Sequence, residues 1–378
     1  MKKLFNIMLI AIGIITANSC ADDSYPVPPA STVPKFTFTI DNDAFAPATA
    51  NFANASIVPE RAGTVAYTWN FGDGTSSVET SPVHMFEAPG AYVVKLVAVT
   101  SESLEINEVT QTIVVRDPNA TGVPLFFTDG SEVFGSIINS AAPIAASIGI
   151  TSLQDSYGMV VDTVNDKLYI ADFDAQSIFV SDLDGKNLAT FRSNIGQPDA
   201  VVIDYDTKSL YWDTDSGIRR ADMTNTDVSQ FEEFVTGHGA DDPEGIAIDN
   251  ATRTLFWNNY NGNVWTKKLD GTGEKLLVTN GGGGSIIVVG TKIYFDDFVA
   301  SGDVQLKNAN FDGTGIATVA TSISRVVYGL GYDKHGKKIY WVDRNLNTIS
   351  RANLDGTSTE PWLVAASSPR GIAIGKKK

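Results

Sequence analysis

A repeat of roughly 42 residues runs from residue 125 to residue 374, and it limits the possible folds of this chain more than any other feature. The second, third and fourth copies open with Gly158-Met-Val-Val-Asp162, Ala200-Val-Val-Ile-Asp204 and Gly245-Ile-Ala-Ile-Asp249. The aspartates that end these opening runs are 42 and 45 residues apart. The opening run of the sixth copy ends at Asp333, 84 residues after Asp249. Self-similarity at such a period is typical of a solenoid, an array or a propeller.

Each copy contains the pattern of four short strands. An aromatic run such as Leu210-Tyr-Trp-Asp-Thr214 follows the opening run, a third run ends in a tight turn, and a fourth resembles Lys275-Leu-Leu-Val278. Asp-Gly between alternating apolar runs predicts a hairpin, because glycine adopts the positive φ that the turn requires. The turns are Asp184-Gly185, Asp270-Gly271, Asp312-Gly313 and Asp355-Gly356, with Met223-Thr-Asn225 in the odd copy. One copy therefore predicts one propeller blade.

The two ends of the array predict how the ring closes. The first copy lacks its opening strand and starts at Leu125-Phe-Phe-Thr-Asp129, while residues 369–374 supply an opening strand with nothing after it. Together the two fragments make one blade, which leaves no long open sheet edge. Counted with the five blades that begin near residues 157, 199, 244, 285 and 328, the composite blade makes six.

The order Gly-Ile-Ala-Ile-Asp, Tyr-Trp-x-x-Asp and Leu-Asp-Gly resembles the YWTD repeat, or LDL-receptor class B, propeller of lipoprotein receptors and laminin-binding matrix proteins. The resemblance covers residues 125–374. It implies an all-β, six-bladed propeller over residues 118–378, in which the aromatic and closing Asp residues of the motif hold the blades together. Thr214 and Asn259 replace the closing Asp, and the fifth copy lacks the Asp of its opening run.

Residues 35–117 form a second predicted module. Tyr67-Thr-Trp-Asn-Phe-Gly-Asp-Gly74, Ser81-Pro-Val-His-Met-Phe86 and Gly90-Ala-Tyr-Val-Val-Lys-Leu96 resemble a PKD domain, which implies an immunoglobulin-like β-sandwich. Trp69 and Phe71 alternate on one strand face, as Tyr92, Val94 and Leu96 do on another. His84 belongs to this motif, and a packing or turn-bonding role is expected for it.

The extreme N-terminus predicts an export signal. Two lysines precede an apolar stretch from Leu4 to Ile15, which is too short for a permanent transmembrane helix, and small residues lead into Cys20, the only cysteine. The pattern resembles a relaxed lipobox and implies a signal peptide over residues 1–19 with lipidation at Cys20. The alternative is a stray thiol in a cleaved signal peptide.

Residues 20–34 are interpreted as the lipidated cysteine and a proline-containing tether. Asp22 and Asp23 resemble the signal that sends some lipoproteins to the exposed face of the outer membrane, although they equally suit a solubilising role. The expectation is an outer-membrane lipoprotein at the cell surface, which contacts the membrane through its lipid anchor only.

The formal net charge is −16, and removal of a signal peptide carrying Lys2 and Lys3 makes it −18. Such an acidic surface repels phosphate backbones, so nucleic-acid binding is excluded. The histidines His84, His238 and His335 have no metal-ligand spacing, and His238 and His335 are expected to be solvated loop residues. We therefore expect no metal and no cofactor.

Two further patterns have ordinary interpretations. The run Gly281–Gly284 precedes a strand, whereas a phosphate-binding loop precedes a helix, so a flexible blade connector is expected. The repeated Asp-Gly pairs are compatible with calcium loops, but their hairpin position favours turn chemistry. No Gly-x-Ser-x-Gly run is present to supply a nucleophile elbow.

In such rings, function depends on places that are equivalent in every blade but carry different residue types from blade to blade. Loops that enter the innermost strand and loops that follow the aromatic strand open on one face, around the channel. The candidates at the mouth are Tyr157, Asp199, Glu244, Ser285, Tyr328 and Arg370. The candidates further out include Phe173, Asp174, Asp215, Tyr260, Asn261, Phe298, Arg344 and Asn345. Aromatic, carboxylate, amide and guanidinium groups suit stacking on sugars or anchoring a peptide, and they equally suit a solvated rim.

Two classes of function follow. The first is a surface-anchored, non-enzymatic binding protein whose propeller captures an extracellular or envelope protein or polysaccharide, with the PKD domain as spacer or adhesion module. The second is a propeller enzyme, such as a lactonase, lyase or glycan hydrolase, that acts through channel carboxylates. Asp199 and Glu244 lie on adjacent blades and form a conceivable pair. The absence of an acid/base or metal signature favours binding.

Overall fold

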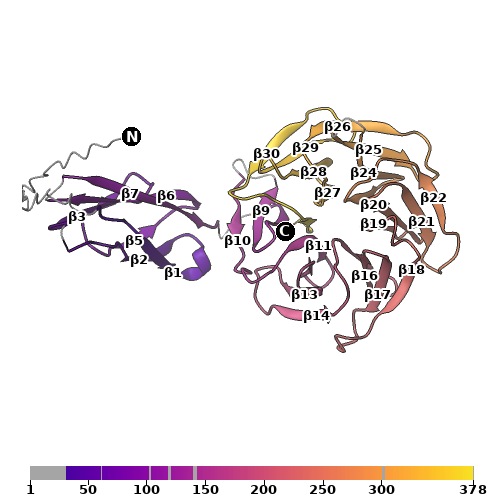
Figure 1. Ribbon diagram of the computed structural model, residues 1–378, viewed down its shortest axis with the longest axis horizontal. Helices are drawn as coiled ribbons and strands as arrows, with labels where there is room; N and C mark the ends of the chain where they lie inside the picture. The colour runs from indigo at the N-terminus through magenta and orange to yellow at the C-terminus, as the bar shows by residue number, and fades with distance from the viewer. Residues whose placement is uncertain are drawn as a thin grey trace, which may run out of the picture. The chain divides into compact units, whose positions relative to one another are not determined.

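The computed structural model describes residues 31–60, 62–101, 104–117, 121–138, 143–299 and 303–377. These residues form β-strands and one short 3-10 helix, η1 (Asn42–Ala44), and none of their helices is long and apolar enough to cross a membrane. The predicted signal peptide, Cys20 and most of the tether lie outside the described residues. The chain divides into two compact units, which are described separately (Figure 1).

The first unit contains two antiparallel sheets, and its all-β architecture confirms the predicted sandwich. The three-stranded sheet has the order β1 (Phe36–Ile40), β2 (Ala48–Asn54), β5 (Val83–Phe86). The four-stranded sheet has the order β4 (Ser76–Ser77), β3 (Val65–Asn70), β6 (Gly90–Thr100), β7 (Ile106–Val115). Trp69 of β3 is fully buried, with its ring centroid 5.0 Å from that of Phe36 and 5.2 Å from that of Phe52.

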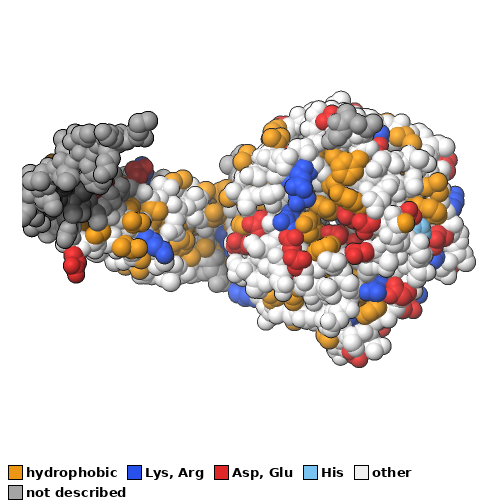
Figure 2. Space-filling view, in the orientation of Figure 1, with side chains coloured by type: hydrophobic (Ala, Val, Ile, Leu, Met, Phe, Trp, Pro, Cys, Tyr) orange, Lys and Arg blue, Asp and Glu red, His pale blue; other side chains and the backbone are white. Residues whose placement is uncertain are grey.

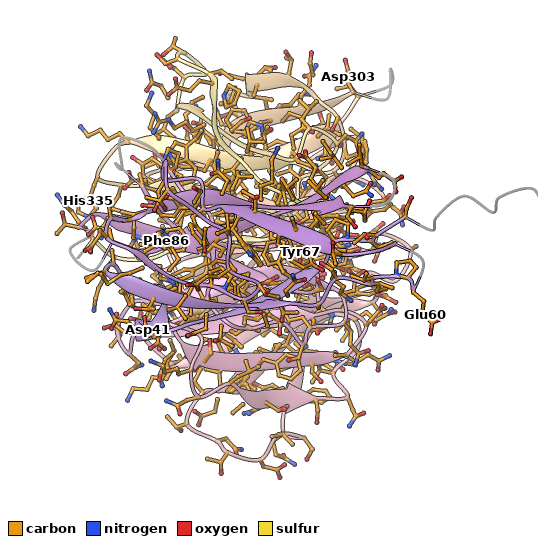
Figure 3. All side chains as sticks on the ribbon, turned by 90° about the vertical axis from the view of Figure 1, so that its left-hand side faces the viewer. Asp41, Glu60, Tyr67, Phe86, Asp303 and His335 are labelled. Atoms are coloured by element: carbon orange, nitrogen blue, oxygen red, sulfur yellow. The ribbon has the colours of Figure 1, made fainter. Side chains whose placement is uncertain are left out.

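His84 has the structural role predicted for it. Its ring is stacked on Phe71 with a centroid separation of 4.0 Å, and its Nε2 lies 2.7 Å from Asp73 Oδ2. Phe86, at the end of the same strand and labelled in Figure 3, is buried. Its ring is stacked on that of Tyr92 with a centroid separation of 4.4 Å. These contacts bring residues from the three motif segments together in the core of the domain.

The second unit is a ring of six four-stranded antiparallel sheets among the described residues, as the repeat predicts (Figure 1). Two contiguous blades are β11 (Ser156–Asp162), β12 (Lys167–Asp172), β13 (Ser177–Asp182), β14 (Ala189–Ser193) and β15 (Val201–Asp204), β16 (Ser209–Thr214), β17 (Gly217–Asp222), β18 (Glu232–Thr236). The next two are β19 (Pro243–Asp249), β20 (Thr254–Asn259), β21 (Val264–Lys268), β22 (Lys275–Val278) and β23 (Ile286–Val289), β24 (Lys292–Phe298), β25 (Val304–Asn310), β26 (Ala317–Ile323). The fifth is β27 (Leu330–Asp333), β28 (Lys338–Asp343), β29 (Thr348–Asn353), β30 (Glu360–Val364).

The sixth blade is composite and confirms the predicted closure. Its sheet order is β10 (Ala146–Ser147), β9 (Val133–Ile138), β8 (Val123–Thr128), β31 (Ile372–Ile374). In this sheet Ile372 is opposite Phe127 and Ile374 is opposite Leu125. The C-terminal strand therefore supplies the innermost position of a blade whose other strands come from the start of the propeller.

The glycine that opens most copies of the repeat allows neighbouring blades to approach closely. A Cβ atom at Gly158 would lie 2.2 Å from the carbonyl oxygen of Asp199, and one at Gly371 would lie 2.0 Å from that of Tyr157. At these distances any side chain collides with the backbone of the next blade. The inner strands can therefore surround a narrow channel because these positions lack a side chain.

The outer hairpins have the predicted turn chemistry. Gly271 has a φ of 90°, and the Asp270 carboxylate accepts hydrogen bonds from the backbone N–H of Thr272 and from its hydroxyl. Asp312 and Asp355 make the same pair of bonds to the threonine two residues later. Because these carboxylates are engaged in closing the turn, the turn interpretation explains the repeated Asp-Gly without calcium.

The aromatic strands form the walls between blades. Trp212 and Trp257 are fully buried, as expected for motif residues with a structural role. The closing aspartates fasten the loops: Asp172 accepts from the backbone N–H groups of Gln154 and Asp155 at 2.8 and 3.0 Å. The non-repeating loops of the ring face are therefore held by repeating residues beneath them.

Candidate functional site: a pocket at the channel mouth

The loops at one end of the channel enclose a cavity of about 270 Å³. Its lining residues come from six different loops or strand ends, and they are Tyr157, Phe173, Asp199, Asp215, Asp242, Glu244 and Tyr328. All but Asp242 were among the residues that the sequence placed around the channel. Figure 2 shows acidic side chains gathered at the centre of the ring face, beside hydrophobic and basic ones. We call this cavity the mouth pocket.

The repeat explains why these residues meet. Tyr157 and Glu244 lie at the start of the inner strands β11 and β19, and Asp199 lies two residues before β15. Phe173 and Asp215 follow the aromatic strands β12 and β16. Inner strands start on the face where aromatic strands end, because the two are antiparallel neighbours. Equivalent positions of successive blades therefore converge on one opening.

Two of the lining carboxylates are almost fully buried. Glu244 is 7% exposed and Asp199 is 8% exposed. The Oε2 atom of Glu244 is inaccessible to solvent and has no hydrogen-bond partner among the described residues. Buried polar atoms are nearly always hydrogen-bonded, so this oxygen is an exception that requires an explanation.

Burial and mutual repulsion raise the pKa values of these carboxyl groups. Desolvation, together with the nearby charges of Asp242 and Asp215, raises the pKa of Asp199 to about 8. The pKa of Glu244 is well above its ordinary value because the group is buried and because Asp199 and Asp213 lie close to it. Desolvation and the Asp215 charge also raise the pKa of Asp242. The mouth pocket therefore combines carboxyl groups that cannot all ionise at low cost.

A second layer of buried acids lies beneath the pocket. Asp213 of β16 accepts hydrogen bonds from the backbone N–H groups of Asp199 at 3.1 Å and Ala200 at 2.6 Å. Asp296 of β24 accepts from the N–H groups of Ser285 at 2.8 Å and Val327 at 2.9 Å. Burial raises the pKa of Asp296 to about 6, although its hydrogen bonds favour the ionised form. These two acids fix the backbone that carries the lining residues.

The opposite wall of the pocket is aromatic. The rings of Tyr157 and Tyr328 have centroids 4.6 Å apart, and Phe173 meets Tyr157 edge to face at 5.8 Å. The Arg344 guanidinium lies over both tyrosine rings, 5.1 Å from the centroid of Tyr328 and 5.7 Å from that of Tyr157. Arg370 lies 4.6 Å over the Tyr157 ring.

Arg370 is neutralised by a neighbouring carboxylate. Its guanidinium forms an ion pair with Asp155, which also accepts a hydrogen bond from the Tyr157 hydroxyl at 3.1 Å. Arg344 forms no ion pair in the part of the chain that the structure describes. Both predicted arginines therefore border the pocket without entering its lining.

The remaining candidates lie elsewhere. Ser285 lines the central channel below, a cavity of about 230 Å³, and its backbone N–H and hydroxyl face Asp296 Oδ1. Asp174 is exposed on the rim. Tyr260 is 38% exposed and contacts Phe298 edge to face at 5.9 Å. The structure does not bring these three residues into the mouth pocket.

The prediction that His238 is solvated was wrong. Its side chain is 6% exposed and lies edge-on to the rings of Trp257 and Trp265, at 5.4 and 4.9 Å. Its two ring nitrogens lie 3.0 Å from Asp241 Oδ2 and 3.1 Å from Glu274 Oε1. The His238 imidazole is buried because it packs against tryptophan rings and lies within hydrogen-bond distance of carboxylates, most of which are distant in sequence. His335 is exposed in its turn, as predicted (Figure 3).

The glycine run 281–284 connects two blades as predicted, but it is packed tightly. A Cβ atom at Gly282 would lie 2.0 Å from the carbonyl oxygen of Tyr260. The backbone N–H groups of Gly281 and Gly283 bond Asp297 Oδ1 and the carbonyl of Asn259, at 2.8 and 3.0 Å. Close approach to neighbouring backbone accounts for these glycines, so the description of the segment as flexible was wrong.

Sequence reasoning missed Asp242 as a lining residue and treated Asp213 and Asp296 as part of the motif. One signal was available: the fourth residue of the aromatic strand is polar in three successive copies, at Asp213, Asn258 and Asp296, and apolar in the flanking copies, at Ala171 and Val342. No group of three or more His, Cys, Asp or Glu side chains suited to a metal ion occurs among the described residues. The pocket offers carboxyl groups and aromatic faces to a ligand.

Family comparisons agree with both modules. A family described as PKD domain matches residues 31–115, and the low-density lipoprotein receptor repeat class B matches residues 166–205. The chain therefore contains a PKD domain and a propeller with the YWTD type of repeat.

Curated relatives match only in part. Collagenase ColA of Bacillus cereus is 39% identical over 62 residues, which is 16% of this chain and 6% of that protein. The microbial collagenase of Vibrio alginolyticus is 24% identical over 155 residues, 39% of this chain and 18% of that protein. This chain thus spans a small fraction of these relatives, and their activity does not carry over with the match.

Solved structures share the fold. A chain of the nidogen/laminin complex is 18% identical with a TM-score of 0.59, over 67% of this chain and 98% of that chain. TolB from Acinetobacter baumannii is 12% identical with a TM-score of 0.55, over 76% of this chain and 80% of that chain. At these identities the likeness establishes the propeller architecture alone.

Proposed function

We propose that this chain, which carries a PKD domain and a YWTD-type propeller, is a non-enzymatic binding protein that captures a protein or polysaccharide at the mouth pocket. The observation that carries the proposal is the composition of the pocket. Tyr157, Tyr328 and Phe173 give it flat apolar walls, and Asp199 and Glu244 give it directional polar groups. A few polar groups converging on aromatic walls are characteristic of ligand sites.

The position of the pocket supports the same function. Its residues occupy equivalent places in different copies of the repeat, yet they do not repeat in chemistry. Residues kept alike in every blade maintain the ring, whereas residues that differ at the channel mouth are free to serve recognition. A propeller of this fold occurs in a complex of nidogen with laminin, which is consistent with a protein ligand.

The PKD domain is assigned a spacer or adhesion role in this proposal. A collagenase of Bacillus cereus shares sequence with this chain over 62 residues. We place the chain at the outer membrane, with lipidated Cys20 as its anchor. Metabolic labelling with a palmitate analogue tests the anchor: label should be incorporated into the full chain and be lost in Cys20→Ala.

The experiment for the main proposal is a binding screen with the purified full chain against arrays of bacterial and host polysaccharides and of envelope proteins. We expect saturable binding that Tyr328→Ala reduces at least about tenfold, because the ring forms one wall of the pocket. Tyr260→Ala is the matched control, since it removes an exposed tyrosine outside the pocket lining. Equal loss in the two variants, or binding that neither affects, would contradict the assignment of the site.

One observation favours an enzyme as the second candidate. Asp199 and Glu244 share a pocket in which burial and repulsion raise both pKa values, as general acids require. A screen of chromogenic glycosides, lactones and esters tests this alternative. Turnover that Glu244→Gln abolishes would replace the binding assignment with a catalytic one.

A further inference from the structure

Glu244 is the starting point for a more specific statement about the ligand. Its Oε2 atom lies in a pocket-lining side chain, is closed off from solvent and accepts no hydrogen bond among the described residues. A carboxylate oxygen buried without a donor is unfavourable in the free protein. Such a group is satisfied when a bound molecule supplies the missing donor. The unpaired carboxyl group of Glu244 therefore marks the side of the pocket at which a ligand donor is favoured.

The charges around Glu244 indicate which kind of donor. Asp199, Asp215 and Asp242 line the same pocket, and Asp213 and Asp296 lie beneath it close enough to raise the pKa of Glu244. Of the two arginines that border the pocket, Arg344 is stacked over the tyrosine rings and Arg370 is paired with Asp155. The pocket thus has an excess of acidic groups that its own arginines do not neutralise. A cationic donor is favoured over a neutral one by this field.

The aromatic wall indicates the shape of that cation. Tyr157, Tyr328 and Phe173 line the pocket together with the acids. A cation carried on an alkyl stem can lay the stem against such rings while its charge meets the carboxylates. A bare metal ion would leave the rings unused, and no suitable cluster of metal ligands occurs in the described part of the chain.

We propose that the mouth pocket receives an alkylammonium or guanidinium group, which donates hydrogen bonds to Glu244 and Asp199 while its stem packs against Tyr157 and Tyr328. This inference rests on the proposed binding function and specifies its ligand chemistry. A lysine or arginine side chain of a protein partner and a free alkylamine both carry such a group. The two sources differ in whether a peptide backbone is needed for affinity.

The test measures calorimetric binding of three probes to the full chain at pH 8 and low salt. The probes are a blocked hexapeptide with one central lysine, the same peptide with norleucine in place of lysine, and 1,5-diaminopentane. We expect the lysine peptide to bind at least about tenfold more tightly than the norleucine peptide. Tighter binding of the diamine than of the lysine peptide would identify a free amine as the source. Equal binding of the two peptides, or no binding of either cation at ~10 mM, would overturn the proposal.

A charge-only variant separates this inference from the broader function. Glu244→Gln keeps the size of the side chain and removes its charge, so cation binding should weaken at least about tenfold. Asp270→Asn is the control, because its carboxylate lies in a hairpin turn outside the pocket. If a partner found in the array screen is lost in Tyr328→Ala but binds Glu244→Gln unchanged, the binding function stands and the cation assignment falls.

Proton release provides a readout that a purely structural role of Glu244 would not move. In the free protein, burial and neighbouring acids raise the pKa of Asp199 to about 8 and also raise the pKa of Glu244. A bound cation stabilises their ionised forms, so binding should release protons and strengthen as the pH rises. Titrations in two buffers with different ionisation heats measure this release. Its absence in the presence of tight cation binding would show that the cation does not contact these carboxyls.

Discussion

Of three consecutive blades, those of Asp199 and Glu244 place buried acids at the channel mouth and the third places Asp296 beneath it, whereas the other three blades place aromatic rings and guanidinium groups at the mouth. We call these the acidic half and the aromatic half. Both halves have the same four-stranded sheets and the same strand order. The comparison shows that the repeat specifies the backbone of the ring, and that the chemistry of the mouth varies on it independently.

The fourth residue of the aromatic strand illustrates the difference. In the acidic half Asp213 and Asp296 bond the backbone that enters the inner strands. In the aromatic half Ala171 and Val342 are buried at that place and contribute packing. Polar anchoring binds specific N–H groups, whereas apolar packing is less directional, so the two halves should respond differently to substitution.

The largest expected effect is the loss of such an anchor. Asp296→Ala leaves the buried N–H groups of Ser285 and Val327 without their acceptor, and should lower the free energy of unfolding by about 3–5 kcal/mol. Val342→Ala in the aromatic half should cost about 1–3 kcal/mol, through a small cavity. Urea unfolding followed by circular dichroism measures both. Equal costs would show that the anchor bonds contribute nothing beyond packing.

Neutralising a carboxyl group should change the free energy of unfolding in opposite directions in the two halves. At pH 8, Asp199→Asn should raise the free energy of unfolding by roughly 1–3 kcal/mol, because it removes a buried charge that repels Asp215 and Asp242. Asp155→Asn should lower it by about 1 kcal/mol, because Asp155 is paired with Arg370. Parallel urea titrations compare the signs. A loss of stability in Asp199→Asn would mean that its charge is compensated.

The pH dependence of stability follows from the acidic half. Asp199 has a pKa of about 8 in the folded chain and about 3.9 when unfolded, so the folded state binds more protons between these values. Its contribution is complete below about pH 4 and is lost as the pH rises through about 8. The Tm should therefore fall between pH 5 and pH 8, by roughly 2–4 °C per kcal/mol. Asp199→Asn should flatten this slope, whereas Asp155→Asn should leave it unchanged.

The smallest effects are expected at the outer hairpins, where the halves are alike. Asp270 lies in the acidic half and Asp355 in the aromatic half, and each makes the same two bonds to a threonine. Either change to alanine should shift Tm by no more than about 2 °C, and the two shifts should be equal. Differential scanning calorimetry resolves the comparison. Unequal shifts would indicate that the asymmetry of the mouth extends to the rim.

Much of the fold could be predicted because its determinants are local and repeated. The opening glycine, the aromatic strand and the Asp-Gly turn recur in register, and the missing strand at one end matches the surplus strand at the other. The convergence of Tyr157, Asp199, Glu244 and Tyr328 followed from strand direction alone. These predictions required no knowledge of how individual side chains pack.

The details of the site could not be predicted, because they depend on contacts between residues far apart in sequence. The burial of His238 depends on Trp265 and Glu274, which belong to strands and turns about 30 residues away. The raised pKa of Glu244 depends on its burial and on which acids of neighbouring blades lie close to it. Spacing identifies the loop that carries a residue, whereas burial, pairing and pKa arise only when all six blades are assembled.

The composite blade has a mechanical consequence. Strand β8, the first of the propeller, lies inside its sheet, with β9 on one side and the C-terminal β31 on the other. Tension applied through the N-terminal connection must shear both rows of hydrogen bonds together, so the C-terminal strand acts as a clasp on the segment that carries the pull. Force spectroscopy of the chain with and without residues 372–378 should reveal a lower rupture force once the clasp is removed.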